Sequence, residues 1–197
     1  MSGAHWITTL ERATFAGGGS SDFDLNPGNA RPDVALRDAA VLVGVIMRDE
    51  PMIVLTKRAS HLKHHPGQVA FPGGKMDEGD PSLHDTALRE AHEEIGLPPE
   101  NVTVLGVLPP HQTVTQFQVT PVLAHIHTDF VPSPEVGEVE EMFEVPLAHV
   151  LNPDAYLVQS RIWMRERRYY YTLPYGPYYI WGATARMLRV LCDRVQP

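Results

Sequence analysis

Residues 71–97, "FPGGKMDEGDPSLHDTALREAHEEIGL", contain seven Asp or Glu residues and four glycines. Residues 85–95 contain neither Gly nor Pro, and either Asp80 or Ser82 is a suitable cap for a helix that begins before them. Gly96 suits the left-handed conformation that commonly ends a helix. The stretch therefore predicts a Gly-Gly turn followed by an acidic helix.

The predicted helix has one apolar face and one acidic face. At about 100° per residue, Ala91 and Ile95 fall on the apolar face, which can dock on a sheet. Glu90, Glu93 and Glu94 stand at positions i, i+3 and i+4 on the other face, where like charges repel. Hard oxygen ligands suit Mg²⁺ or Mn²⁺, so these three glutamates are candidate metal ligands.

A second interpretation of the acidic face is a solvated surface of an amphipathic helix. Arg89 lies four residues before Glu93, where it can pair with that carboxylate and hold its orientation. The Gly-Gly turn before the helix and the Gly96 cap after it favour the metal site over the solvated surface.

Strand and helix patterns surround this stretch. An apolar run at 39–47 and another at 52–56 predict a β-hairpin. Further patterns predict strands at 102–108, 117–126, 156–164, 167–173 and 178–181, and a closing helix at 183–195. Their irregular alternation predicts an α/β (α+β) fold, with a mixed β-sheet and helices packed on it.

The length of 197 residues predicts a single packed domain, which we expect at residues 36–197. Residues 1–35 are expected to be an N-terminal extension, partly flexible, with a short helix near 7–15 and a Gly-, Ser- and Pro-rich loop at 16–35. No apolar run approaches the roughly 20 residues of a membrane span, and no secretory signal is recognised. A single cysteine, Cys192, fits a reducing compartment, so a cytoplasmic protein is expected.

The formal net charge of −8 disfavours nonspecific binding to nucleic acid or to an anionic membrane. An anionic substrate must therefore meet local cations. The segment 57–65 concentrates basic side chains in this acidic chain: Lys57, Arg58, Lys63, His61, His64 and His65. It is either a solubilising surface loop or a counter-charge for phosphates.

The helix motif "REAHEEIGL", residues 89–97, resembles the signature of the Nudix hydrolases. That signature reads Gly, five residues, Glu, seven residues, Arg-Glu-hydrophobic-any-Glu-Glu-any-Gly-hydrophobic. Here five residues lead from Gly74 to Asp80, which stands in place of the Glu, and eight residues rather than seven separate Asp80 from Arg89. The spacing among the helix glutamates is intact.

Two further stretches are similar to the coenzyme A pyrophosphatase branch of this family. "VLTKRASHLKHHPGQVAFPGG", residues 54–74, resembles that branch's upstream motif, with Val54 and Lys63 in place of its usual Leu and Arg, and "YYIWGATARML", residues 178–188, also looks similar. The resemblance implies a Nudix-like α/β/α sandwich and a metal shell in which the Gly74 carbonyl joins the helix glutamates. It also implies five substrate-binding residues: Lys57, Arg58, Lys63, Phe71 and Gly73.

The activity that the resemblance implies is a Mg²⁺- or Mn²⁺-dependent hydrolysis of coenzyme A or its thioesters to 3′,5′-ADP and 4′-phosphopantetheine or its acyl derivative. Glu93 and Arg89 are expected to be catalytic. The segment "EVEEMFEVP", residues 138–146, offers acids for a general base, of which Glu141 is chosen over Glu138, Glu140 and Glu144.

Other substrates and roles stay open. ADP-ribose, a dinucleotide or a nucleoside triphosphate are alternative substrates, and a non-catalytic nucleotide-binding domain is an alternative of a different class. The expected partner is a small molecule, without nucleic acid or membrane, and the protein is expected to be a monomer or a homodimer.

Overall fold

The computed structural model describes residues 3–14, 17–28, 34–63, 65–163 and 165–195. Its elements alternate between strands and helices, as expected for an α/β (α+β) fold. They run in the order α1 (Gly3–Ala13), β1 (Ser20–Ser21), β2 (Arg37–Met47), β3 (Pro51–Arg58), β4 (Val69–Ala70), β5 (Gly73–Lys75), α2 (Leu83–Ile95), η1 (Pro99–Asn101), β6 (Val102–Val107), β7 (His111–Gln112), β8 (Phe117–Ile126), β9 (Val139–Pro146), α3 (Leu147–Val150), η2 (Pro153–Ala155), β10 (Leu157–Trp163), β11 (Glu166–Tyr175), β12 (Tyr178–Trp181) and α4 (Gly182–Val195).

The centre of the molecule is a mixed sheet built around β2. This strand pairs in parallel with β8, with Ala39 opposite Val119, and antiparallel with β3, with Val45 opposite Ile53. Its residues are buried on both faces because layers pack on both sides of the sheet, which explains the continuous apolar run at 39–47. The hairpin predicted at 39–56 is confirmed, and so is the mixed sheet.

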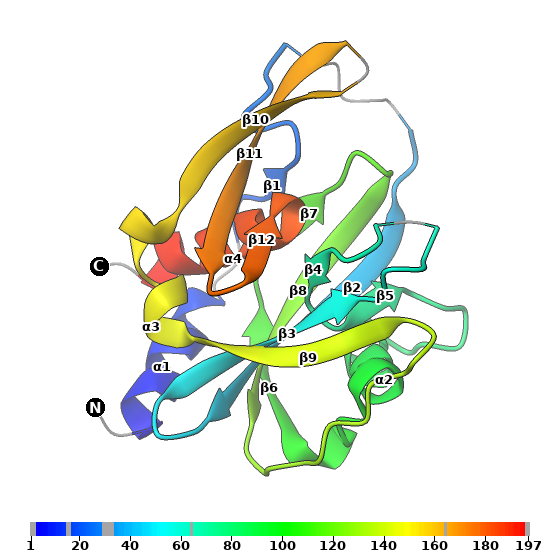
Figure 1. Cartoon of the computed structure of the whole chain (residues 1–197). Helices are drawn as coiled ribbons and strands as arrows, with labels where there is room; N and C mark the ends of the chain where they lie inside the picture. The colour runs from blue at the N-terminus through cyan, green and yellow to red at the C-terminus, as the bar shows by residue number, and fades with distance from the viewer. Residues whose placement is uncertain (1–2, 15–16, 29–33, 64, 164, 196–197) are drawn as a thin grey trace.

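Two separate apolar cores lie on the two faces of this sheet. On one face, Ala87, Ala91 and Ile95 of α2 pack against sheet residues that include Leu42. On the other, α4 packs together with α1 and with a second, three-stranded sheet in the order β10-β11-β12 (Figure 1). The arrangement is a layered α/β/α sandwich, and the predicted fold class is confirmed.

The acidic helix begins earlier than its Gly- and Pro-free run, at Leu83, because Ser82 caps it. The Ser82 hydroxyl accepts a hydrogen bond from the backbone N–H of Asp85, and Gly96 ends the helix in the left-handed conformation (φ 70°). Of the two caps that the sequence allowed, Ser82 is therefore the one used. The Gly-Gly segment, expected as a turn, instead forms β5 against β2, with Gly74 opposite Ala40.

Helix α1 packs against the sandwich. Leu10 and Ala13 of α1 belong to the larger core. Ser20 and Ser21, within the stretch expected to be a loop, form β1 and pair in parallel with β7. No helix in the described ranges is long and apolar enough to cross a membrane.

Candidate active site

The three glutamates of α2 differ in exposure. The side chain of Glu94 is 6% exposed and that of Glu90 is 16% exposed, whereas that of Glu93 is 58% exposed. Glu94 is therefore buried, Glu90 is partly buried and Glu93 lies at the surface.

Glu94 sits in a desolvated position beside the Gly-Gly strand. Its carboxylate accepts a hydrogen bond from the Gly73 backbone N–H at 3.2 Å and lies 3.9 Å from the Arg58 guanidinium. The pKa of Glu94 is raised to about 7, mainly by burial and also by the charges of Glu90 and Glu138, while the Gly73 N–H and the Arg58 guanidinium oppose the shift. A nearby cation would stabilise the charged form of such a buried carboxylate.

Glu90 lies against the backbone of Gly74. A Cβ at position 74 would come within 2.5 Å of Glu90 Oε1, so only glycine permits this approach. Burial raises the pKa of Glu90, and the Arg89 guanidinium, 3.0 Å away, opposes that shift. Gly74 and Glu90 are therefore in contact, as a shared metal shell would require.

Arg89 organises the acids around it. Its guanidinium binds both oxygens of Asp80 at 3.0 Å and contacts Glu90 and Glu93 at 3.0 Å each. The pair with Glu93 is the i, i+4 contact that the spacing predicted. Asp80, whose position departs from the family signature, also accepts a hydrogen bond from Thr86, so it fixes both Arg89 and the first turn of the helix.

Replacing Asp80 with asparagine is expected to make the protein less stable in a pH-dependent way. Hydrogen bonds from Arg89 hold the pKa of Asp80 well below its usual range. A lowered pKa contributes stability above the ordinary carboxyl value and loses it as the pH falls towards the folded value. The difference in urea unfolding free energy between wild type and Asp80→Asn is expected to be constant above about pH 5 and to shrink below about pH 4. A difference that stays flat down to pH 3 would contradict this role.

The donor set fits a hard divalent cation. In the part of the chain that the structure describes, no three acidic, cysteine or histidine side chains converge on one point, and the Glu93 carboxylate pairs with Arg89. Glu90 and Glu94 nevertheless offer buried carboxylate oxygens whose charge is poorly solvated, beside the backbone of Gly73 and Gly74. Oxygen donors of this kind suit Mg²⁺ or Mn²⁺.

The basic segment divides between the site and the surface. Arg58 lies beside Glu94. Lys57 turns instead to β9, where it binds Glu140 at 2.6 Å and approaches Glu141 at 3.7 Å. Lys63 is exposed. His64 lies outside the described residues.

A cavity of about 500 Å³ is lined by Arg58 and Gly73, two residues that contact the Glu94 carboxylate. Arg58, Phe71 and Gly73 line it from the large sheet, and Tyr170 and Trp181 line it from the second sheet. Five residues were expected to bind substrate. Arg58, Phe71 and Gly73 line the cavity, whereas Lys57 and Lys63 are not among its described lining residues.

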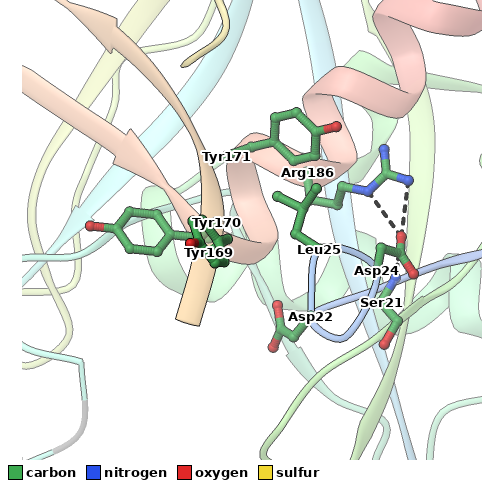
Figure 2. A pocket seen from close by; sticks show the side chains of 9 residues that line it. Ser21, Asp22, Asp24, Leu25, Tyr169, Tyr170, Tyr171 and Arg186 are labelled. Atoms are coloured by element: carbon green, nitrogen blue, oxygen red, sulfur yellow. Dashed lines mark hydrogen bonds and ion pairs between the residues drawn. The ribbon is translucent and has the colours of Figure 1, made fainter. Parts of the chain in front are cut away.

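The N-terminal segment forms another wall of this cavity, which sequence analysis left without a role. Asp22 and Asn26 line it. Asn26 exchanges two hydrogen bonds with the backbone of Tyr169, and Asp24 binds Arg186 of α4 at 2.9 Å. Figure 2 shows this segment beside β11 and α4, with both Arg186–Asp24 contacts.

The acids of β9 are not equivalent. Glu141 accepts a hydrogen bond from the Tyr178 hydroxyl at 3.2 Å and lies near Lys57. Glu138, just before the strand, is exposed, and its charge contributes to the raised pKa of both Glu90 and Glu94. Glu138 is therefore electrostatically coupled to both of these carboxylates.

A helix of carboxylates packed against a Gly-Gly strand, beside a cavity with a basic side chain, is a site suited to hydrolysis of an anionic substrate. The chain belongs to the Nudix family: the family model described as NUDIX domain matches residues 36–171. The family suggested by the helix motif is therefore confirmed, and the protein is a Nudix-type pyrophosphatase.

Similar proteins support this assignment over most of the chain. An uncharacterized Nudix hydrolase NudL of Enterobacter sp. (strain 638) is 45% identical over 179 residues, which cover 87% of this chain and 89% of the relative. A protein of the same description from Pectobacterium atrosepticum is 44% identical over 169 residues, with 86% and 88% covered. The crystal structure of a MutT/nudix family protein from Enterococcus faecalis matches with a TM-score of 0.53 at 17% identity, covers 99% of this chain and 74% of that chain, and supports the fold alone.

Proposed function

We propose that this protein hydrolyses the diphosphate of coenzyme A or its thioesters, giving 3′,5′-ADP and 4′-phosphopantetheine or its acyl derivative. The observation that carries the proposal is the position of Arg58. It lines the large cavity and lies 3.9 Å from Glu94, so a diphosphate in the cavity would have a guanidinium beside the acidic helix. The similarity of residues 54–74 to the coenzyme A pyrophosphatase branch supports coenzyme A as the substrate.

In this proposal Glu90, Glu93 and Glu94 hold Mg²⁺ or Mn²⁺, with the Gly74 carbonyl as a further ligand. The bound ion supplies charge neutralisation on the phosphate oxygens and lowers the pKa of a water. Arg89 keeps Glu93 and Glu90 oriented, and Arg58 binds a non-bridging phosphate oxygen. Water adds to one phosphorus, the bridging P–O bond breaks, and the other phosphate leaves.

A general base must accept the proton of the attacking water. Glu141 is the sequence-based candidate, but its carboxylate is engaged by Tyr178 and Lys57. We propose Glu138 ahead of it, because Glu138 is exposed and its charge acts on both buried glutamates.

Glu138→Gln is expected to lower kcat by about tenfold to a hundredfold, since the bound metal still activates water when the base is lost. Glu141→Gln, the matched substitution, is expected to lower kcat less than about threefold. Steady-state kinetics of both variants would separate the two acids. A larger decrease in kcat for Glu141→Gln than for Glu138→Gln would identify Glu141 as the general base.

The proposed activity is tested by incubating the protein with coenzyme A and Mg²⁺ or Mn²⁺ and separating the products by chromatography. Release of 3′,5′-ADP with 4′-phosphopantetheine is the expected result. ADP-ribose, a dinucleotide and a nucleoside triphosphate serve as competing substrates. Efficient cleavage of one of these without 3′,5′-ADP release from coenzyme A would overturn the substrate, and absence of turnover on all of them would favour a binding domain.

A further inference from the structure

Two arginines stand side by side on adjacent strands of the second sheet. Arg161 of β10 and Arg168 of β11 are direct cross-strand partners in the antiparallel register, and both line the large cavity. Side chains directly opposite in such a pair lie on the same face, where like charges destabilise the sheet. An anion bound between the two guanidinium groups would offset that repulsion.

The charges around the cavity favour an anion. Among the described residues that line it, Arg58, Arg161 and Arg168 are the permanently cationic ones, and Asp22 is the one acid. Asp22 is engaged by the His111 imidazole at 3.1 Å and by the Val114 backbone N–H at 2.9 Å. The lining is therefore positive within a chain whose net charge is −8.

Aromatic rings stand beside the arginine pair. The Arg161 guanidinium lies over the Trp181 ring, 4.6 Å from its centre, and Tyr170 contacts Trp181 edge-on at 5.3 Å. Both rings line the cavity. Aromatic faces beside arginines suit a nucleotide, whose base can stack while its phosphate meets the cations.

We propose that Arg161 and Arg168 form a second phosphate subsite that holds a phosphomonoester on the ribose of a nucleoside diphosphate substrate. The inference rests on the proposed function, in which the diphosphate lies near Arg58 and Glu94. The matching group in coenzyme A is its 3′-phosphate. The 2′-phosphate of NADP offers the same chemistry, so the experiment includes both.

Binding is measured first, by calorimetry without metal, with 3′,5′-ADP, 2′,5′-ADP and 5′-AMP as probes. Wild type is expected to bind 3′,5′-ADP about tenfold or more tightly than 5′-AMP, because a charge-assisted bidentate contact is strong. Arg161→Gln and Arg168→Gln are expected to lose most of that preference, and Arg161→Lys to keep part of it. The control is Arg167→Gln, since the neighbouring Arg167 binds Ser160 and is not among the described lining residues.

Turnover is measured second, with coenzyme A and 3′-dephospho-coenzyme A. Arg161→Gln is expected to lower kcat/KM for coenzyme A by about tenfold to a hundredfold, mainly through KM, and that for the dephosphorylated form by less than about threefold. Arg167→Gln is expected to leave both values unchanged.

The outcomes separate the subsite from the proposed function. Equal binding of 3′,5′-ADP, 2′,5′-ADP and 5′-AMP by wild type would overturn the subsite even if coenzyme A is cleaved. A preference for 3′,5′-ADP that depends on Arg161, without cleavage of coenzyme A, would support the subsite and overturn the proposed function. Tightest binding of 2′,5′-ADP, again dependent on Arg161, would keep the subsite and assign it to a 2′-phosphate.

Discussion

Glu93→Gln is expected to lower kcat about a hundredfold or more while leaving the fold intact. Glutamine keeps the size of the side chain but removes the charge that a divalent ion requires of a ligand. The Glu93 side chain is 58% exposed, and it pairs with Arg89 one helical turn earlier, in an i, i+4 contact. Loss of such a pair costs only about 0.5 kcal/mol of stability, so the defect should appear in catalysis alone.

The measurement is steady-state turnover of coenzyme A together with thermal unfolding of the same preparations. Glu100→Gln is the matched control, because Glu100 is an exposed glutamate in η1, just after the acidic helix. It should match wild type in both assays. Wild-type turnover by Glu93→Gln would remove Glu93 from the metal site.

Gly73→Ala is expected to destabilise the protein by about 3 kcal/mol or more, since it combines backbone strain with overpacking. Gly73 has a φ of 156°, and a Cβ there would lie 2.4 Å from the Ala40 carbonyl oxygen and 2.6 Å from the Val41 Cα. Both are backbone atoms of the central strand, so neither can move aside without disturbing the sheet. The shift would also displace the N–H that binds Glu94.

Urea unfolding of Gly73→Ala is compared with that of Gly79→Ala. A Cβ at Gly79 meets no atom within 4 Å, so that substitution should change the unfolding free energy by less than about 1 kcal/mol. Equal unfolding free energies for the two variants would show that β5 can shift to accept a side chain.

Local features of the chain were predictable from the sequence. The acidic helix, the first hairpin and the β10–β11 pair follow from periodicity and turn residues that act over a few positions. The i, i+4 contact of Arg89 with Glu93 is set by helix geometry alone, so the sequence predicts it directly.

Features that depend on long-range pairing were not predictable. Lys57 turns to Glu140 because β3 pairs with β9, a register that the separate sequence patterns do not specify. The opposed arginines at 161 and 168 are set by the register of a hairpin, and their cavity exists only because the second sheet faces the first. The position of Asp80 is fixed by its contact with Arg89, nine residues further along the chain. The spacing of the motif does not predict this contact.

The wall that Asp22 and Asn26 contribute comes from residues far from the carboxylate helix in the chain. In the proposed mechanism the helix glutamates serve bond breaking, whereas the N-terminal segment shapes part of the cavity for the substrate. We therefore expect substitutions of Asp22 or Asn26 to alter substrate preference without displacing the glutamates of α2. Proteins that share this helix can then differ in substrate preference while they keep the same hydrolytic chemistry.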